Sequence, residues 1–62
     1  MKAADKKLVY VLEDNANIGD IIEFLLTEEL YEVKVCKSVA CFWDEMSQKK
    51  PDMIVLDIIL PD

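Results

Sequence analysis

The 62-residue chain has no histidine, no arginine, one glycine and two cysteines. A structural zinc site needs a cluster of Cys and His ligands, which two cysteines do not supply. A disulfide framework uses more cysteines in a secretory context, so we expect Cys36 and Cys41 to be reduced thiols packed as small apolar residues. All seven basic residues are lysines in a chain of net charge −6. No basic stripe is present, so this segment is not expected to bind nucleic acid.

Long apolar runs are also lacking near the charged N-terminus. The run that follows it, Leu8–Leu12, has five residues, too few for a membrane span or for the core of a signal peptide. We therefore expect a cytoplasmic protein with no membrane partner.

What the chain does have is an alternation of five short segments. Their patterns predict a strand, helix, strand, helix and strand in that order, at residues 7–12, 16–29, 31–36, 39–48 and 52–57. Such alternation is typical of βαβ units with a parallel sheet. With right-handed crossovers, the expected fold is a single α/β domain over residues 1–62: a βαβαβ half of a doubly wound parallel sheet, with strand order 2-1-3 and helices on opposite faces.

Each predicted helix has an apolar stripe and a capping residue. Asn15 and Ser38 are expected N-caps, because their side-chain oxygens can accept amides of the first helical turn. Helical spacing predicts that two sets of side chains face the core: Ile18, Ile21, Ile22, Leu25 and Leu26 on the first helix, and Val39, Phe42, Trp43 and Met46 on the second. The segment 31–36 alternates apolar and polar residues, which indicates a half-exposed edge strand with Cys36 on its polar side.

Acidic residues follow or end two of the strands. Glu13 and Asp14 come after the first strand, and Asp57 interrupts an apolar run at the end of the third. Strands one and three are neighbours in a 2-1-3 sheet, so the three carboxylates are expected to converge at its carboxyl edge. Their mutual repulsion can be relieved in two ways: one of the carboxyl groups is protonated, or a hard divalent cation such as Mg²⁺ binds to them. An aspartate beside such a cation can act as a nucleophile toward phosphorus.

These segments resemble the response-regulator receiver domains of two-component signalling, which have a flavodoxin-like fold. The resemblance is carried by the first strand with its acidic pair, Leu8 to Asn15, and by the third strand with its following loop, Pro51 to Asp62. It implies that Asp57 is the phosphoacceptor. It also implies that Asp14, Glu13 through water, Asp57 and the backbone carbonyl of Ile59 hold Mg²⁺.

The resemblance implies a receiver module rather than an enzyme, with at most magnesium-dependent self-phosphorylation from a phosphodonor. Its partner in the family is a histidine kinase or a histidine phosphotransfer protein. The match covers the N-terminal half of a receiver. The Thr or Ser of the fourth strand and the Lys of the fifth come later in the family, so we expect phosphotransfer by residues 1–62 alone to be impaired.

Two alternatives stay open beside the phosphoacceptor. One is a non-catalytic half-receiver that folds and self-associates, with the bare outer edge of the third strand paired in a homodimer. The other is an unrelated α/β nucleotide binder. It is disfavoured because the turn after the first strand, residues 13–17, has no phosphate-cradling glycine.

Overall fold

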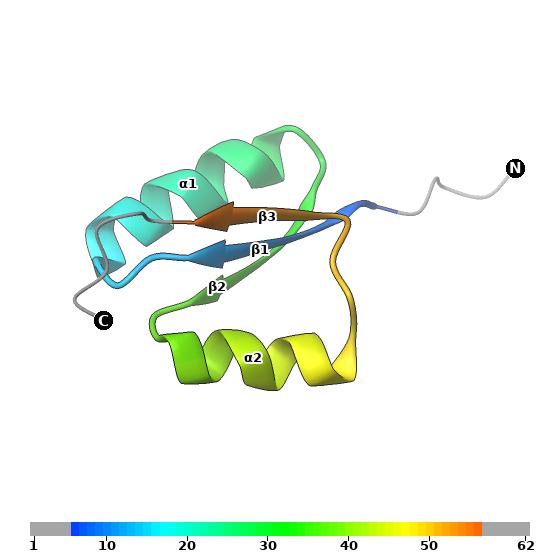
Figure 1. Ribbon diagram of the computed structural model, residues 1–62. Coiled ribbons are helices and arrows are strands. Elements are labelled where there is room, and N and C mark those ends of the chain that lie inside the picture. The colour runs from blue at the N-terminus through cyan, green and yellow to red at the C-terminus, as the bar shows by residue number, and fades with distance from the viewer. Residues whose placement is uncertain (1–5, 57–62) are drawn as a thin grey trace, which may run out of the picture.

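The computed structural model describes residues 6–56, which form a parallel sheet between two helices (Figure 1). The elements follow in the order β1 (Leu8–Leu12), α1 (Ala16–Glu28), β2 (Glu32–Cys36), α2 (Val39–Gln48) and β3 (Met53–Leu56). The sheet order is β2-β1-β3, and both pairings are parallel. The predicted α/β class and the 2-1-3 strand order are confirmed.

The strand register assigns the side chains to the two faces of the sheet. Val9 pairs with Val33 and Met53, and Tyr10 pairs with Lys34 and Ile54. Because paired residues of parallel strands point to the same face, the odd-numbered residues of β1 share a face with Val33. The even-numbered residues share the face with Lys34. Figure 1 shows α1 on one side of the sheet and α2 on the other, as the sequence predicts.

β1 is the core of the described chain, since all five of its residues are buried. On the α2 side a cluster of buried side chains joins β1 to the end of β2 and to α2; it comprises Leu8, Tyr10, Leu12, Cys36 and Phe42. The rings of Tyr10 and Phe42 meet edge to face, with centroids 6.3 Å apart. The Tyr10 hydroxyl donates hydrogen bonds to the backbone carbonyls of Glu45 and Lys49, so this buried ring also fixes the end of α2.

The ends of both helices are capped as their residues dictate. Asn15 Oδ1 accepts the Ile18 amide at 3.1 Å, and Ser38 Oγ accepts the Cys41 amide at 3.1 Å. Both predicted N-caps are therefore confirmed. α1 ends differently, because Leu30 lies in the left-handed region with φ of 69°. There the Leu30 amide donates to the Thr27 carbonyl and the Tyr31 amide to the Leu26 carbonyl, the pattern of a Schellman motif.

The prediction that one whole apolar stripe of each helix is buried is wrong in part. On α1, the residues facing the sheet are Gly19, which is buried, and Ile22 and Leu26, which are half-buried. Gly19 sits so close to the sheet that an added Cβ would lie 3.2 Å from Val35 Cγ1. The remaining predicted core residues of that stripe are exposed: Ile18, Ile21 and Leu25. The apolar arc of α1 is thus wider than the sheet surface beneath it.

The burial predicted for α2 is also wrong in part, because two of its predicted core residues are exposed. On β2 the error is the reverse, because a residue predicted on the polar side is buried. Phe42 is buried and Met46 half-buried, but Val39 and Trp43 are exposed. Cys36, predicted on the polar side of its strand, is fully buried because α2 covers that end of β2. Its packing as a small apolar residue is as expected.

β3 is the least covered element. Within residues 6–56, no Cα atom of either helix comes within 8 Å of a Cα atom of β3, and β1 is its neighbour in the sheet. Its first residues are held by the preceding Asp52: the Leu8 amide donates to Asp52 Oδ2 at 2.7 Å, and the Asp52 amide donates to the Leu8 carbonyl at 2.7 Å. Met53, Ile54 and Leu56 remain 40–57% exposed, so both faces of this strand are open.

Candidate functional site

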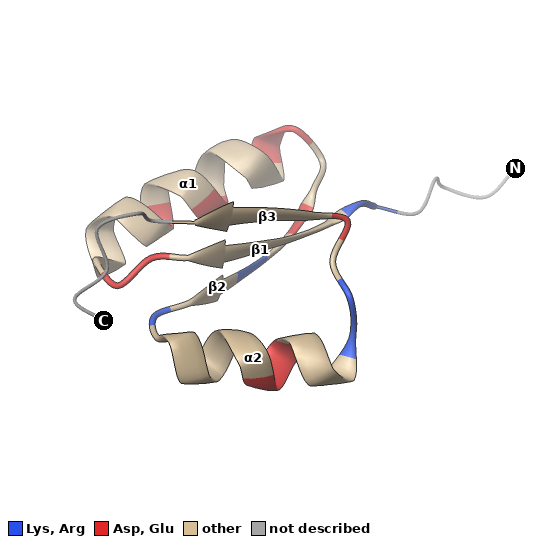
Figure 2. Ribbon diagram, viewed as in Figure 1, with Lys and Arg blue, Asp and Glu red and all other residues tan. Residues whose placement is uncertain are grey.

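The acidic pair lies directly beyond the carboxyl end of the central strand. Figure 2 shows an acidic segment immediately after the arrowhead of β1. Glu13 is buried, with 7% of its surface exposed, whereas Asp14 is exposed. The pair therefore combines a carboxylate fixed in the protein with one that faces solvent.

Backbone hydrogen bonds set the position of Glu13. Its amide donates to the Cys36 carbonyl at 2.9 Å, which extends the β1–β2 pairing one residue past the strand. Its Oε2 accepts the Asn15 amide at 3.2 Å. Asn15 in turn caps α1, so the turn from β1 into α1 and the side chain of Glu13 are built as one unit.

The third predicted carboxylate, Asp57, lies outside the described residues, as does the Ile59 carbonyl. The structure does describe the strand that leads to Asp57. Leu56 pairs with Leu12 across the sheet, and in the sequence Leu12 precedes Glu13 while Leu56 precedes Asp57. In the part of the chain that the structure describes, no group of three His, Cys, Asp or Glu side chains could hold a metal ion; the described members of the predicted set are Glu13 and Asp14.

The chemistry of the described donors fits a hard cation. Glu13 and Asp14 are adjacent carboxylates at the edge of a parallel sheet, and Mg²⁺ is bound in proteins by one or two carboxylates together with waters and phosphate oxygens. Sequence reasoning missed the Cys36 carbonyl that holds the Glu13 amide, because a backbone contact between strand ends leaves no residue-type signal.

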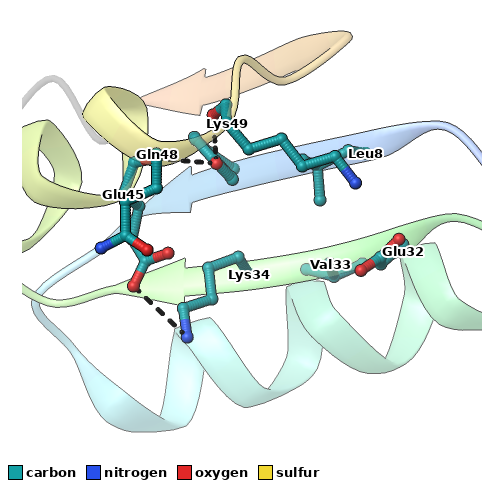
Figure 3. Close-up of a pocket in the computed structure, with 8 residues that line it drawn as sticks. Leu8, Glu32, Val33, Lys34, Glu45, Gln48 and Lys49 are labelled. Carbon is teal, nitrogen blue, oxygen red and sulfur yellow. Dashed lines mark hydrogen bonds and ion pairs between the residues drawn. The ribbon is translucent and has the colours of Figure 1, made fainter.

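A groove of about 390 Å³ lies elsewhere, lined by the start of β1, by β2 and by the end of α2 (Figure 3). Its charged residues include Lys34 and Glu45, whose Nζ and Oε2 atoms are 3.5 Å apart. Leu8 begins β1 and Lys49 follows α2, so this groove is at the amino end of the strands, away from Glu13 and Asp14. Sites in parallel sheets form at the carboxyl end, and we do not assign this groove to the acidic pair.

Neither described helix has the length and apolar character that crossing a bilayer requires.

Comparison with known proteins finds similarity to curated sequences but not to a family model or a solved structure. No family model matches the chain, and no solved structure matches it. Among 23 curated proteins that match, the chain is similar to the transcriptional regulatory protein CreB of Escherichia coli (strain K12), with 30% identity over 57 residues. The aligned part is 92% of this chain and 25% of CreB, so the chain spans about a quarter of the length of that relative. This similarity supports a receiver-domain-like origin for the chain at a coarse level.

Proposed function

We propose that the chain is the phosphoacceptor part of a two-component phosphorelay, with Asp57 as the acceptor and with Glu13 and Asp14 as ligands of Mg²⁺. One observation supports the proposal most directly. Leu12 and Leu56 are paired residues of adjacent parallel strands, and each is followed in the sequence by an acidic residue, Glu13 and Asp57. The similarity to a transcriptional regulatory protein agrees with this proposal at a coarser level.

The reaction we propose is a transfer from a phosphohistidine of a kinase or phosphotransfer protein. An oxygen of the Asp57 carboxylate attacks phosphorus and the phosphorus–nitrogen bond breaks. The imidazole, which already carries a proton on its other ring nitrogen, leaves as the neutral ring, and Asp57 becomes an acyl phosphate. A bound Mg²⁺ would neutralise charge on the phosphoryl oxygens. The contribution of the described residues is to hold a buried Glu13 through its backbone hydrogen bonds while Asp14 faces solvent.

Mass spectrometry of the intact chain after incubation with acetyl phosphate and Mg²⁺ tests this function. The wild-type chain is expected to gain one phosphoryl group on a fraction of its molecules, in keeping with the impaired transfer expected of residues 1–62 alone, and Asp57→Asn is expected to gain none. Asp44→Asn is the matched control, because Asp44 is an exposed aspartate on α2 and its loss leaves the acceptor in place. Uptake that persists in Asp57→Asn would contradict the assignment of the acceptor.

Calorimetric titration with Mg²⁺ tests the ligands separately. Glu13→Gln and Asp14→Asn keep the size of each side chain and remove its charge, so each is expected to weaken Mg²⁺ binding. Asp44→Asn again serves as the control and is expected to bind as the wild-type chain does. Equal affinity in all of these chains would exclude the acidic pair as the metal site.

A second candidate function, self-association through β3, is favoured by the exposure of that strand. Met53 and Val55 lie on its α1-side face, and Ile54 and Leu56 on its α2-side face. No charged residue interrupts Met53–Leu56, although the chain carries a net charge of −6. A two-fold axis perpendicular to the sheet would pair the β3 strands of two chains in antiparallel orientation. The partner that we propose for the outer edge of β3 is therefore a second copy of the chain.

Sedimentation equilibrium at low micromolar concentration distinguishes the two functions when it is combined with the phosphorylation assay. Self-association predicts a folded dimer whether or not Asp57 takes up phosphate. A folded monomer at that concentration would exclude it. A dimer that takes up no phosphate would support self-association and contradict the phosphoacceptor function for this chain alone.

A further inference from the structure

The apolar surface of α1 continues around the helix beyond the residues that face the sheet. Four large apolar side chains of this helix are 45–63% exposed: Ile18, Ile21, Phe24 and Leu25. At about 100° per residue, these four side chains fall within an arc of about 120°. They therefore form one continuous surface, called the α1 strip below, and contiguous exposed apolar surfaces of this kind mark interaction sites.

The only charged groups around the α1 strip are carboxylates. Every charged residue within 13–32 is acidic, and Figure 2 shows acidic but no basic positions along α1. Asp20 and Glu28 lie four positions before and after Phe24, so they are its neighbours along the helix surface. The first lysine after α1, Lys34, lies on the other face of the sheet, where it pairs with α2.

We propose that the α1 strip binds an amphipathic helix with a basic polar face, supplied by another protein. The apolar side chains of that helix would cover Phe24 and the rest of the strip. Its Lys or Arg side chains would reach Asp20 and Glu28, which form no ion pair with any of residues 6–56. The proposal goes beyond phosphotransfer, since it depends on neither Asp57 nor Mg²⁺.

Charge separates this occupant from a second copy of the chain and from a lipid surface. Two α1 strips packed against each other would place carboxylates beside carboxylates, and like charges across an interface oppose association. Anionic lipid surfaces attract basic helices rather than acidic ones. The strip also belongs to a different element from the β3 edge proposed for self-association. A basic helix is therefore the occupant that this surface fits.

Fluorescence anisotropy with labelled peptides tests the proposal on the whole chain. The probe is a helix-forming peptide of leucine and lysine in which the leucines follow helical spacing. One control peptide has glutamate in place of every lysine, and the other has the composition of the probe in an order that forms no apolar face. The probe alone is expected to bind, and its affinity should fall as salt is added, because salt screens exposed charges. Equal binding of either control peptide overturns the proposal.

Two exposed aromatic residues inside helices provide matched variants for the apolar contact. Phe24 on α1 is 63% exposed and Trp43 on α2 is 59% exposed. Phe24→Ser is expected to weaken binding of the probe about tenfold, whereas Trp43→Ser is expected to bind it as the wild-type chain does. Unchanged binding in Phe24→Ser, or an equal loss in both variants, overturns the proposal.

The charged contact has its own pair of variants. Asp20→Asn is expected to weaken binding of the probe at low salt, and Asp44→Asn, the same change at an exposed position of α2, is expected to leave it unchanged. Circular dichroism should be the same for all four variants, since each replaces an exposed side chain. If Phe24→Ser instead changes the sedimentation of the chain without peptide, the strip binds a second copy and the proposal is overturned.

Discussion

At the scale of single residues, Tyr10 does more than fill the core. Its hydroxyl donates to two backbone carbonyls at the end of α2, those of Glu45 and Lys49. Burial, followed by the charge of Glu45, raises the pKa of this hydroxyl above its ordinary value. The neutral hydroxyl is thus the form that the fold stabilises.

Tyr10→Phe is therefore expected to lower the midpoint of urea unfolding at neutral pH, because it removes both hydrogen bonds and leaves the ring in place. The pH dependence also has a definite sign. With a folded-state pKa above the unfolded value of about 10, the contribution of Tyr10 is complete below pH 10 and is lost as pH rises through the folded-state pKa. Unfolding midpoints measured from pH 7 upward should fall less steeply in Tyr10→Phe.

Tyr31→Phe is the matched control for that measurement. Tyr31 is half-buried, and its hydroxyl makes no hydrogen bond with residues 6–56. Its removal should leave the neutral midpoint nearly unchanged. An equal loss in both variants would mean that the bonds to the end of α2 contribute nothing particular to stability.

At the scale of elements, the end of α1 contains an unfavourable residue at a defined position. Leu30 adopts a φ of 69° and is 72% exposed, so it pays the steric cost of the left-handed region and gains little from burial. Glycine adopts this conformation freely. Leu30→Gly is expected to raise the free energy of unfolding by about 0.5–1 kcal/mol, measured by urea unfolding.

The same substitution inside the helix provides the contrast. Leu25 is also exposed but has an interior position in α1, and Leu25→Gly is expected to cost about 1 kcal/mol. If Leu30→Gly lowers the free energy of unfolding as much as Leu25→Gly does, the left-handed conformation of Leu30 does not determine the effect of the substitution.

The start of α2 offers a second test at this scale. Ser38→Ala removes the oxygen that accepts the Cys41 amide, and N-cap losses of this kind cost about 1 kcal/mol. Ser47→Ala is the control, since the exposed Ser47 hydroxyl donates to the Asp44 carbonyl within the helix and caps nothing. Its effect on the free energy of unfolding should stay within about 0.5 kcal/mol.

The bounds and caps of helices could be predicted where they depend on residues close together in the sequence. The helix at 39–48 has the predicted bounds, and Asn15 and Ser38 cap where expected, because capping depends on residues a few positions apart. The burial of Ile18 and Trp43 was predicted wrongly. Helical periodicity shows that a face is apolar, but it carries no information about how much neighbouring structure covers that face.

At the scale of the whole molecule, the strand order could be predicted because right-handed crossovers leave few arrangements for a βαβαβ chain. The adjacency of the strands that lead to Glu13 and Asp57 follows from that order, whereas the pairing of Leu12 with Leu56 is known only from the structure. For the proposed metal ligands, the sequence gives only residue types at the ends of strands. Their geometry stays a prediction for Asp57 and Ile59, which lie outside the described residues.

A charged substitution on β3 tests its role in assembly. Leu56 is 57% exposed, so Leu56→Lys should leave the single chain folded while it places a cation in the proposed antiparallel seam. The expected result is a shift from dimer to monomer in sedimentation, with unchanged circular dichroism. Leu30→Lys makes the same chemical change between α1 and β2 and should sediment as the wild-type chain does; a dimer that survives Leu56→Lys would place the interface elsewhere.

The uneven support of the three strands also determines how long their amide protons survive in heavy water. β1 has a strand on each side and every one of its residues is buried, so the amides that it donates to β2 should exchange only when the whole domain opens. β3 is held along its ladder to β1 and by the Asp52 bonds at its first end, so it can detach while the rest stays folded. The segment leading to Asp57 would then spend part of its time released from the sheet, and a second chain paired along β3 would slow that exchange.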